Sequence, residues 1–206
     1  MNWMKKVAVA LVCLLPLGLQ AAKVDTLQVK SPSMNKSIEV VVVSPDVAAT
    51  KACPVIYLLH GYGGNARTWV GIKPDLSKIA DEKGIFFVCP DGKNTWYWDS
   101  PLNADVRYET FISDELVKYV DSHYKTVADR KGRAITGLSM GGHGAMWNGL
   151  RHSDVFSAAG STSGGVDIRP FPKNWEMSVQ IGEKAQYPEN WEKYTVINLV
   201  PTLRKD

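Results

Sequence analysis

One serine of this chain has neighbours typical of an activated nucleophile. Residues 137–141 read GLSMG, which matches the pattern G-x-S-x-G with Ser139 at its centre. A short apolar run over residues 133–137 precedes the motif, and a stretch with helical spacing follows it. The pattern predicts a sharp strand-to-helix turn that exposes the serine hydroxyl, because glycines let the neighbouring backbone come close. The simpler interpretation is a glycine-rich turn that happens to contain a serine.

A serine nucleophile also needs donors for the negative charge that develops on the carbonyl oxygen of its substrate. The backbone N–H of Met140 starts the predicted helix, whose N-terminus carries a partial positive charge. We assign the second donor to the backbone N–H of Tyr62, in the segment LLHGYGGN at residues 58–65. His60 in that segment could act as a base. A histidine at this position more often braces the loop through hydrogen bonds.

An aromatic loop follows the next apolar run of the chain. Trp96, Tyr97 and Trp98 stand in the segment KNTWYWDSPLNAD, between a predicted strand and a predicted helix. Such rings can line a substrate cleft and stack on sugar or phenolic groups. Ordinary packing of the same rings against the following helix is an equally good interpretation.

The motifs together resemble those of the Putative esterase family of α/β-hydrolases, which includes esterase D, tributyrin esterases, feruloyl and acetyl-xylan esterases, and mycolyltransferases. The matching segments are residues 57–65, 89–101, 108–124, 137–145 and 156–164, in the family's order. The resemblance covers nearly all of residues 25–165. It implies hydrolysis of a carboxylic ester without a cofactor or metal, Ser139 as nucleophile, Met140 and Tyr62 at the oxyanion hole, and the loop from Trp96 to Trp98 along the substrate cleft.

The chain departs from the family's pattern after the serine. In this fold the acid and then the histidine of the triad follow the nucleophile. The four histidines are His60, His123, His143 and His152. His152 ends the helix that leads away from Ser139, and His143 lies one turn into it, where packing is the usual role. We keep His143 as a possible substitute base.

Two acids, Asp154 and Asp167, follow Ser139, but without a histidine between acid and serine they complete no triad. We therefore expect the chain to be the N-terminal part of a longer esterase, without the fold's last strands. We expect this chain itself to be nearly inactive.

The elements that must position these residues alternate between strands and helices. Two β-branched runs, within residues 26–45, predict an antiparallel hairpin. Continuous apolar runs at 54–61, 85–92 and 133–137 are typical of strands buried on both faces, and residues 155–165 add a further strand. Helices are predicted between them, one with a core stripe at Phe111, Ile112, Leu116 and Val120. The fold class is therefore α/β, a mainly parallel sheet with helices on both faces.

The N-terminus has the pattern of a cleaved secretory signal peptide. Two lysines precede an apolar stretch over residues 7–19, and small residues follow it. The stretch is shorter than the roughly 20 residues that span a bilayer. Bulky Val12 before Cys13 argues against a lipoprotein site. We expect a signal peptide over residues 1–22, one incomplete hydrolase domain over 23–206, and a periplasmic or secreted protein.

Charge and cysteine content narrow the possible partners. The formal net charge is +3, and removing the two lysines of the signal peptide leaves +1. The absence of a basic block argues against a nucleic-acid partner.

Cys53 and Cys89 are expected at opposite ends of neighbouring strands, roughly 20 Å apart. This distance is too long for a disulfide.

Three function hypotheses follow. The first is an exported serine esterase that acts through an acyl-serine intermediate, with esters of carbohydrates among the possible substrates. The second is a non-catalytic glycan-binding module or pseudo-enzyme that keeps the scaffold. The third is an acyltransferase to a sugar acceptor, since the intermediate is shared and only the exclusion of water differs. The sequence does not identify the ester or the oligomeric state.

Overall fold

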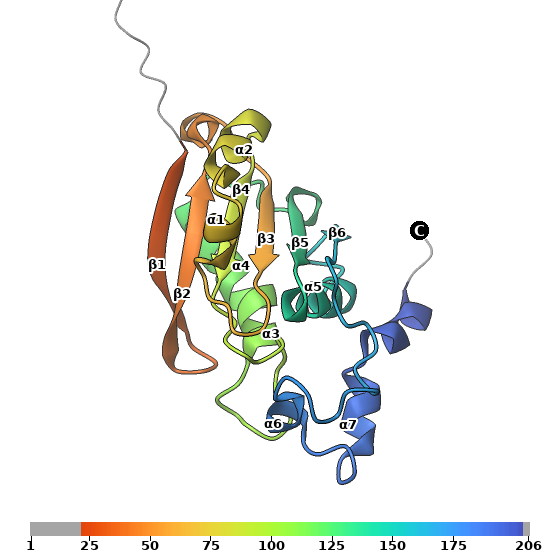
Figure 1. Ribbon diagram of the computed structural model, residues 1–206. Coiled ribbons are helices and arrows are strands. Elements are labelled where there is room, and N and C mark those ends of the chain that lie inside the picture. The colour runs from red at the N-terminus through yellow and green to blue at the C-terminus, as the bar shows by residue number, and fades with distance from the viewer. Residues whose placement is uncertain (1–21, 204–206) are drawn as a thin grey trace, which may run out of the picture.

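The computed structural model describes residues 22–203. The predicted signal peptide and Cys13 lie outside these residues. Six strands form one sheet in the order β1-β2-β4-β3-β5-β6 (Figure 1). Their bounds are β1 Lys23–Ser31, β2 Lys36–Ser44, β3 Val55–Leu59, β4 Phe86–Pro90, β5 Arg133–Gly137 and β6 Ala158–Ala159.

The sheet is antiparallel at one side and parallel through the rest. β1 pairs with β2, and β2 with β4, in antiparallel fashion, whereas β4, β3, β5 and β6 run parallel to their neighbours. The predicted N-terminal hairpin and the mainly parallel sheet are therefore confirmed. The last predicted strand is much shorter than expected: β6 holds two exposed residues at the sheet edge, followed by an isolated bridge between Leu138 and Thr162.

Helices connect the strands and continue past the last one. Their bounds are α1 Thr68–Ile72, α2 Leu76–Lys83, α3 Tyr108–Thr110, α4 Leu116–His123, α5 Met140–Arg151, α6 Met177–Ile181 and α7 Pro188–Lys193, with short 3-10 turns η1 Asp46–Ala49, η3 Arg130–Gly132 and η4 Val196–Thr202. A π-helical turn, η2 Phe111–Glu115, joins α3 to α4. None of the helices among residues 22–203 is long and apolar enough to cross a membrane.

Two hydrophobic cores lie on the two faces of the sheet. Val40 and Val42 of β2 point into the larger core with α4 and α5, whereas Val41 and Val43 point into the smaller core with α2. This alternation follows from the two-residue period of a strand and explains why the central strands are apolar throughout. The predicted helix stripe belongs to the larger core, and its four members are fully buried: Phe111, Ile112, Leu116 and Val120.

The two cysteines of the described chain are buried and free. Cys53 forms an isolated bridge beside β3, and Cys89 lies in β4.

The topology places β3 and β5 as parallel neighbours, with Leu59 opposite Gly137. The segments that leave their carboxyl ends therefore start side by side, where ligands collect in open α/β sheets.

Candidate active site

Ser139 stands at the turn between β5 and α5 in a strained backbone conformation. Its φ is 53° and its ψ is −118°, values that a non-glycine residue rarely adopts. The side chain is exposed. Among residues 22–203 its hydroxyl has no hydrogen-bond partner, whereas its backbone N–H donates to Thr162 O at 2.8 Å. The turn thus presents a free hydroxyl at the N-terminus of a 12-residue helix.

The two glycines of the motif are required by close backbone contacts. A Cβ atom on Gly137 would lie 2.3 Å from the carbonyl oxygen of Gly141. A Cβ atom on Gly141 would lie 2.2 Å from the carbonyl oxygen of Leu59 and 2.5 Å from that of His60. All three distances are far below van der Waals contact. The sequence motif therefore reflects the packing of the α5 N-terminus directly against the end of β3.

The loop after β3 lies against Ser139. A Cβ atom on Gly61 would be 3.5 Å from Ser139 Cβ, so the next residue, Tyr62, stands close to the serine. Among the described residues, neither the backbone N–H of Tyr62 nor that of Met140 has an acceptor in the protein. Two free backbone donors near an exposed serine are the arrangement that stabilises an oxyanion.

His60 braces this loop. Its Nδ1 lies 2.7 Å from Gly61 O, its Nε2 accepts the backbone N–H of Gly92 at 2.9 Å, and the side chain is fully buried. The neighbouring Asp91 is also buried. Burial alone would raise its pKa, but the contact with the His60 ring and the hydrogen bond and ion pair with Lys93 outweigh that effect and hold the pKa at about 2. The bracing interpretation of His60 is therefore confirmed, and neither ring nitrogen is available to Ser139.

A cavity of about 200 Å³ opens beside Ser139. Its wall is largely apolar and aromatic, with one carboxylate. The lining residues are Tyr62, Trp96, Ser139, Met140, Ser163, Gly165, Asp167, Ile168, Phe171, Trp175 and Met177. The cavity therefore gathers the predicted nucleophile, both residues assigned to the oxyanion hole and one member of the aromatic loop.

Tyr97 and Trp98 do not lie where the resemblance places them, along the substrate cleft. Tyr97 and Trp98 are fully buried and do not line the cavity. The Tyr97 hydroxyl donates to His60 O at 3.1 Å, and the Trp98 indole N–H donates to His143 Nε2 at 3.0 Å. Of the three aromatic residues, only Trp96 lines the cavity.

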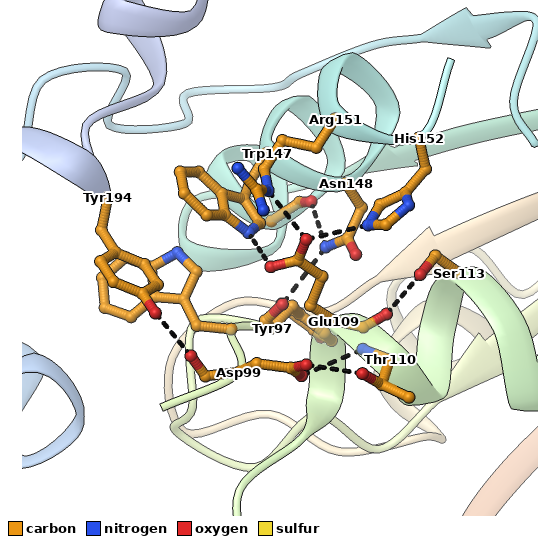
Figure 2. Close-up of polar contacts among 12 residues, drawn as sticks. Tyr97, Asp99, Glu109, Thr110, Ser113, Trp147, Asn148, Arg151, His152 and Tyr194 are labelled. Atoms are coloured by element: carbon orange, nitrogen blue, oxygen red, sulfur yellow. Dashed lines mark hydrogen bonds and ion pairs between the residues drawn. The ribbon is translucent and has the colours of Figure 1, made fainter. Parts of the chain in front are cut away.

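The histidines after Ser139 have structural partners. His143 is fully buried, its Nδ1 lies 2.7 Å from Gly165 O, and burial lowers its pKa to about 4. His152 contacts the buried carboxylate of Glu109 at 2.9 Å, beside Trp147 and Arg151 (Figure 2). Of the other two, His60 braces its loop and exposed His123 lies 2.8 Å from Tyr119 O. Within residues 22–203, no histidine side chain forms a hydrogen bond with the Ser139 hydroxyl.

The acid residues are placed differently. Asp167 lies on the cavity wall, where both carboxylate oxygens accept hydrogen bonds from Arg169 at 2.8 Å, and these bonds lower its pKa. Asp154 is exposed outside the cavity. The described residues contain no cluster of three or more histidine, cysteine or acidic side chains suited to a metal ion.

Residues 163–177 supply most of the cavity wall, and the sequence did not reveal them. Ile168, Phe171, Trp175 and Met177 come from a segment without helical or strand periodicity. Its path depends on tertiary contacts such as the hydrogen bond from the Trp96 indole to Trp175 O at 3.1 Å. The aromatic pair Phe171 and Trp175, soon after the last predicted strand, was the available signal.

Comparisons with known proteins find similarity to esterases. Esterase MT1326 of Mycobacterium tuberculosis is 31% identical over 149 residues, which cover 69% of this chain and 32% of the relative. The endo-1,4-beta-xylanase/feruloyl esterase of Xylanibacter ruminicola is 34% identical over 123 residues, covering 55% of this chain and 17% of the relative. A solved ferulic acid esterase has a TM-score of 0.69 at 29% identity, covering 91% of this chain and 74% of that one. The chain thus spans a third or less of these curated relatives.

The fold and the site point to one family. The mixed sheet with its parallel centre, the strained turn at Ser139 and the glycine loop after β3 are the features of an α/β-hydrolase fold. The family model described as Putative esterase matches residues 31–206, which is most of the chain. By this match, the chain belongs to the Putative esterase family.

Proposed function

We propose that this protein is a serine hydrolase of carboxylic esters that acts through an acyl-Ser139 intermediate. The strained backbone of Ser139 carries the proposal. A non-glycine residue at such angles costs about 1–3 kcal/mol and persists where the geometry is needed. A binding module without chemistry does not need this strain. We therefore prefer an esterase to the non-catalytic alternative.

The proposed reaction starts with attack of Ser139 Oγ on the acyl carbon of the ester. The tetrahedral oxyanion accepts hydrogen bonds from the N–H groups of Met140 and Tyr62. Collapse breaks the bond to the alcohol, which leaves with the proton given up by the serine. Water then attacks the acyl-serine and releases the carboxylic acid. Transfer to a sugar acceptor would use the same intermediate with an alcohol in place of water.

The cavity wall supports an acyl group of limited size with apolar surface. Trp96, Phe171 and Trp175 can contact it, and Asp167 is the one charged group beside them. We propose that Trp96 contacts the substrate, whereas buried Tyr97 and Trp98 hold the loop that carries it.

Proton transfer is the incomplete part of the site. A serine at its ordinary pKa is a weak nucleophile and needs a positioned base. All four histidines have other partners, so we propose that residues 1–206 alone acylate slowly and turn over poorly. General-base assistance typically accelerates a reaction about 10²–10⁴-fold. We expect acylation of Ser139 to be slower by about this factor than in a site with a positioned base.

Labelling with a fluorophosphonate tests the nucleophile. Residues 1–206 incubated with excess probe should gain one phosphonyl group on Ser139, located by peptide mass spectrometry. Ser139→Ala is the matched control and should remain unlabelled. Labelling of another residue, or equal labelling of both proteins, would contradict the assignment of Ser139.

We also propose that the protein is exported after cleavage near Ala21 or Ala22. The basic start and the apolar stretch over residues 7–19 support this proposal. N-terminal sequencing of the mature protein from an expressing bacterium should begin near residue 23. A mature protein that still begins at Met1 would contradict it.

A further inference from the structure

His143 connects two separate segments beneath the cavity. Its ring is fully buried, and both nitrogens have partners: Nδ1 lies 2.7 Å from Gly165 O, and Nε2 lies 3.0 Å from the indole nitrogen of Trp98. A carbonyl can only accept, and an indole N–H can only donate. The ring must therefore be the neutral tautomer with its proton on Nδ1. The low pKa of the buried ring, about 4, keeps this form at neutral pH.

One partner, Gly165, is itself part of the cavity lining, and the other, Trp98, packs against a second lining residue, Trp96. Trp98 stacks on Trp96 with ring centroids 5.5 Å apart and an interplanar angle of 22°. The His143 ring also meets Trp96 edge-on, at 5.2 Å and 84°. One side chain thus contacts two separate parts of the cavity lining, Gly165 and Trp96, and its backbone N–H donates to Ser139 O at 3.0 Å.

We propose that His143 is a positioning residue that sets the width of the acyl cavity by tying the wall at Gly165 to the wall at Trp96. The identification of this cavity as the acyl site rests on the proposed function. The proposal assigns His143 no proton transfer, because both ring nitrogens are already used. The consequence is selectivity for the size of the acyl group. Small acyl groups fit the cavity while His143 keeps both contacts, and loss of these contacts admits bulkier acyl groups.

The direct test compares acylation by two esters that share a leaving group. Intact-protein mass spectrometry would follow acetylation by p-nitrophenyl acetate and benzoylation by p-nitrophenyl benzoate, with imidazole supplied as base. His143→Ala should raise the ratio of benzoylation to acetylation rates about fivefold, the factor expected from one neutral hydrogen bond. His143→Asn keeps a donor near the Nδ1 position, so its ratio should stay closer to that of the unchanged protein.

Glu109→Gln is the control for general structural damage. Glu109 holds the other end of α5 through Trp147, Arg151 and His152 and does not line the cavity. This variant should lower the melting temperature without changing the acylation ratio. If His143→Ala leaves the ratio unchanged, or if Glu109→Gln shifts it equally, the positioning role is wrong.

A binding measurement separates this proposal from the proposed function. If the unchanged protein is not acylated at Ser139, the proposed function fails, but benzamide can still report the cavity width. By ligand-observed NMR, His143→Ala should bind benzamide about fivefold more tightly than the unchanged protein, again the factor of one hydrogen bond. Equal affinities would overturn the role of His143, as would a ¹⁵N spectrum that places the ring proton on Nε2.

Discussion

At the scale of single residues, the site is defined by a conformation as much as by a side chain. Ser139 combines a φ of 53° with an exposed hydroxyl, and it directly precedes the free N–H of Met140. A relaxed backbone would turn the hydroxyl away from that donor. Strain at this residue is therefore part of the site and should be measurable as lost stability.

Replacing Ser139 with glycine should stabilise the protein. Ser139→Gly should raise the free energy of unfolding by about 1 kcal/mol, because glycine adopts the observed angles without a Cβ clash, and this relief exceeds its greater entropy when unfolded. Ser139→Ala keeps the Cβ atom and should leave stability nearly unchanged. Urea unfolding of the three proteins measures the difference. A glycine variant no more stable than the alanine variant would show that the turn is unstrained.

At the scale of elements, the site depends on how closely α5 packs against the end of β3. Gly141 makes this approach, since its Cα lies against the carbonyl groups of Leu59 and His60. The motif glycines are therefore contacts between elements, and their replacement should separate the nucleophile from the loop that carries Tyr62.

Gly141→Ala should destabilise the protein by about 3 kcal/mol or more, because overpacking against rigid backbone forces α5 to shift. Gly71→Ala is a matched control in α1, where an added Cβ has nothing within 4 Å. Its stability should change by no more than about 1 kcal/mol. Thermal unfolding followed by circular dichroism distinguishes the two variants. Similar melting temperatures would contradict the packing argument.

The elements were predictable from sequence where hydrophobic pattern and turn chemistry agree. The hairpin, the buried strands β3, β4 and β5, and the helix after Ser139 follow from apolar runs bounded by glycine and polar residues. Gly84 ends α2 in the left-handed conformation, at φ 64°, which glycine adopts readily and which often ends a helix. The strand-to-helix turn at Ser139 could be predicted because the motif specifies the turn itself.

The remainder of the site could not be predicted because tertiary contacts determine it. Helices α6 and α7 are too short to show an amphipathic period. Tertiary contacts hold them: Met177, Ile181 and Trp191 are buried in the larger core, and the Tyr194 hydroxyl after α7 donates to Asp99 O. The burial of Tyr97 and Trp98 likewise depends on the partners His60 and His143, which no local pattern reveals.

At the scale of the whole molecule, two buried titratable groups on or against α5 should limit stability in acid. His143 has a folded-state pKa of about 4, below its ordinary value of 6.5, because burial disfavours its charged form. Burial would raise the pKa of Glu109. Hydrogen bonds from His152, Arg151 and Trp147 outweigh that effect and lower the pKa from 4.5 to about 2. In both cases the unfolded chain binds protons more readily than the folded protein.

Stability should therefore fall in two overlapping windows as the pH is lowered. The His143 contribution, about 3 kcal/mol for a shift of this size, should be lost between about pH 6.5 and pH 4. The Glu109 contribution should be lost between about pH 4.5 and pH 2. Urea unfolding at a series of pH values measures both, and His143→Asn should lack the first window. Equal stability at pH 6.5 and pH 4.5 would contradict the account of His143.

The central claim is that Ser139 is a nucleophile whose base is absent from residues 1–206. The most direct test is hydrolysis of p-nitrophenyl acetate with and without added imidazole. Ser139→Ala is the control, because imidazole also hydrolyses this ester without the serine. Without imidazole, we expect the unchanged protein and Ser139→Ala to release p-nitrophenol at nearly equal rates. With imidazole, we expect the unchanged protein to release p-nitrophenol faster than Ser139→Ala and to carry an acetyl group on Ser139. Equal rates with imidazole and no acetyl-Ser139 would contradict the nucleophile. Rapid turnover without imidazole that His143→Ala abolishes would contradict the missing base.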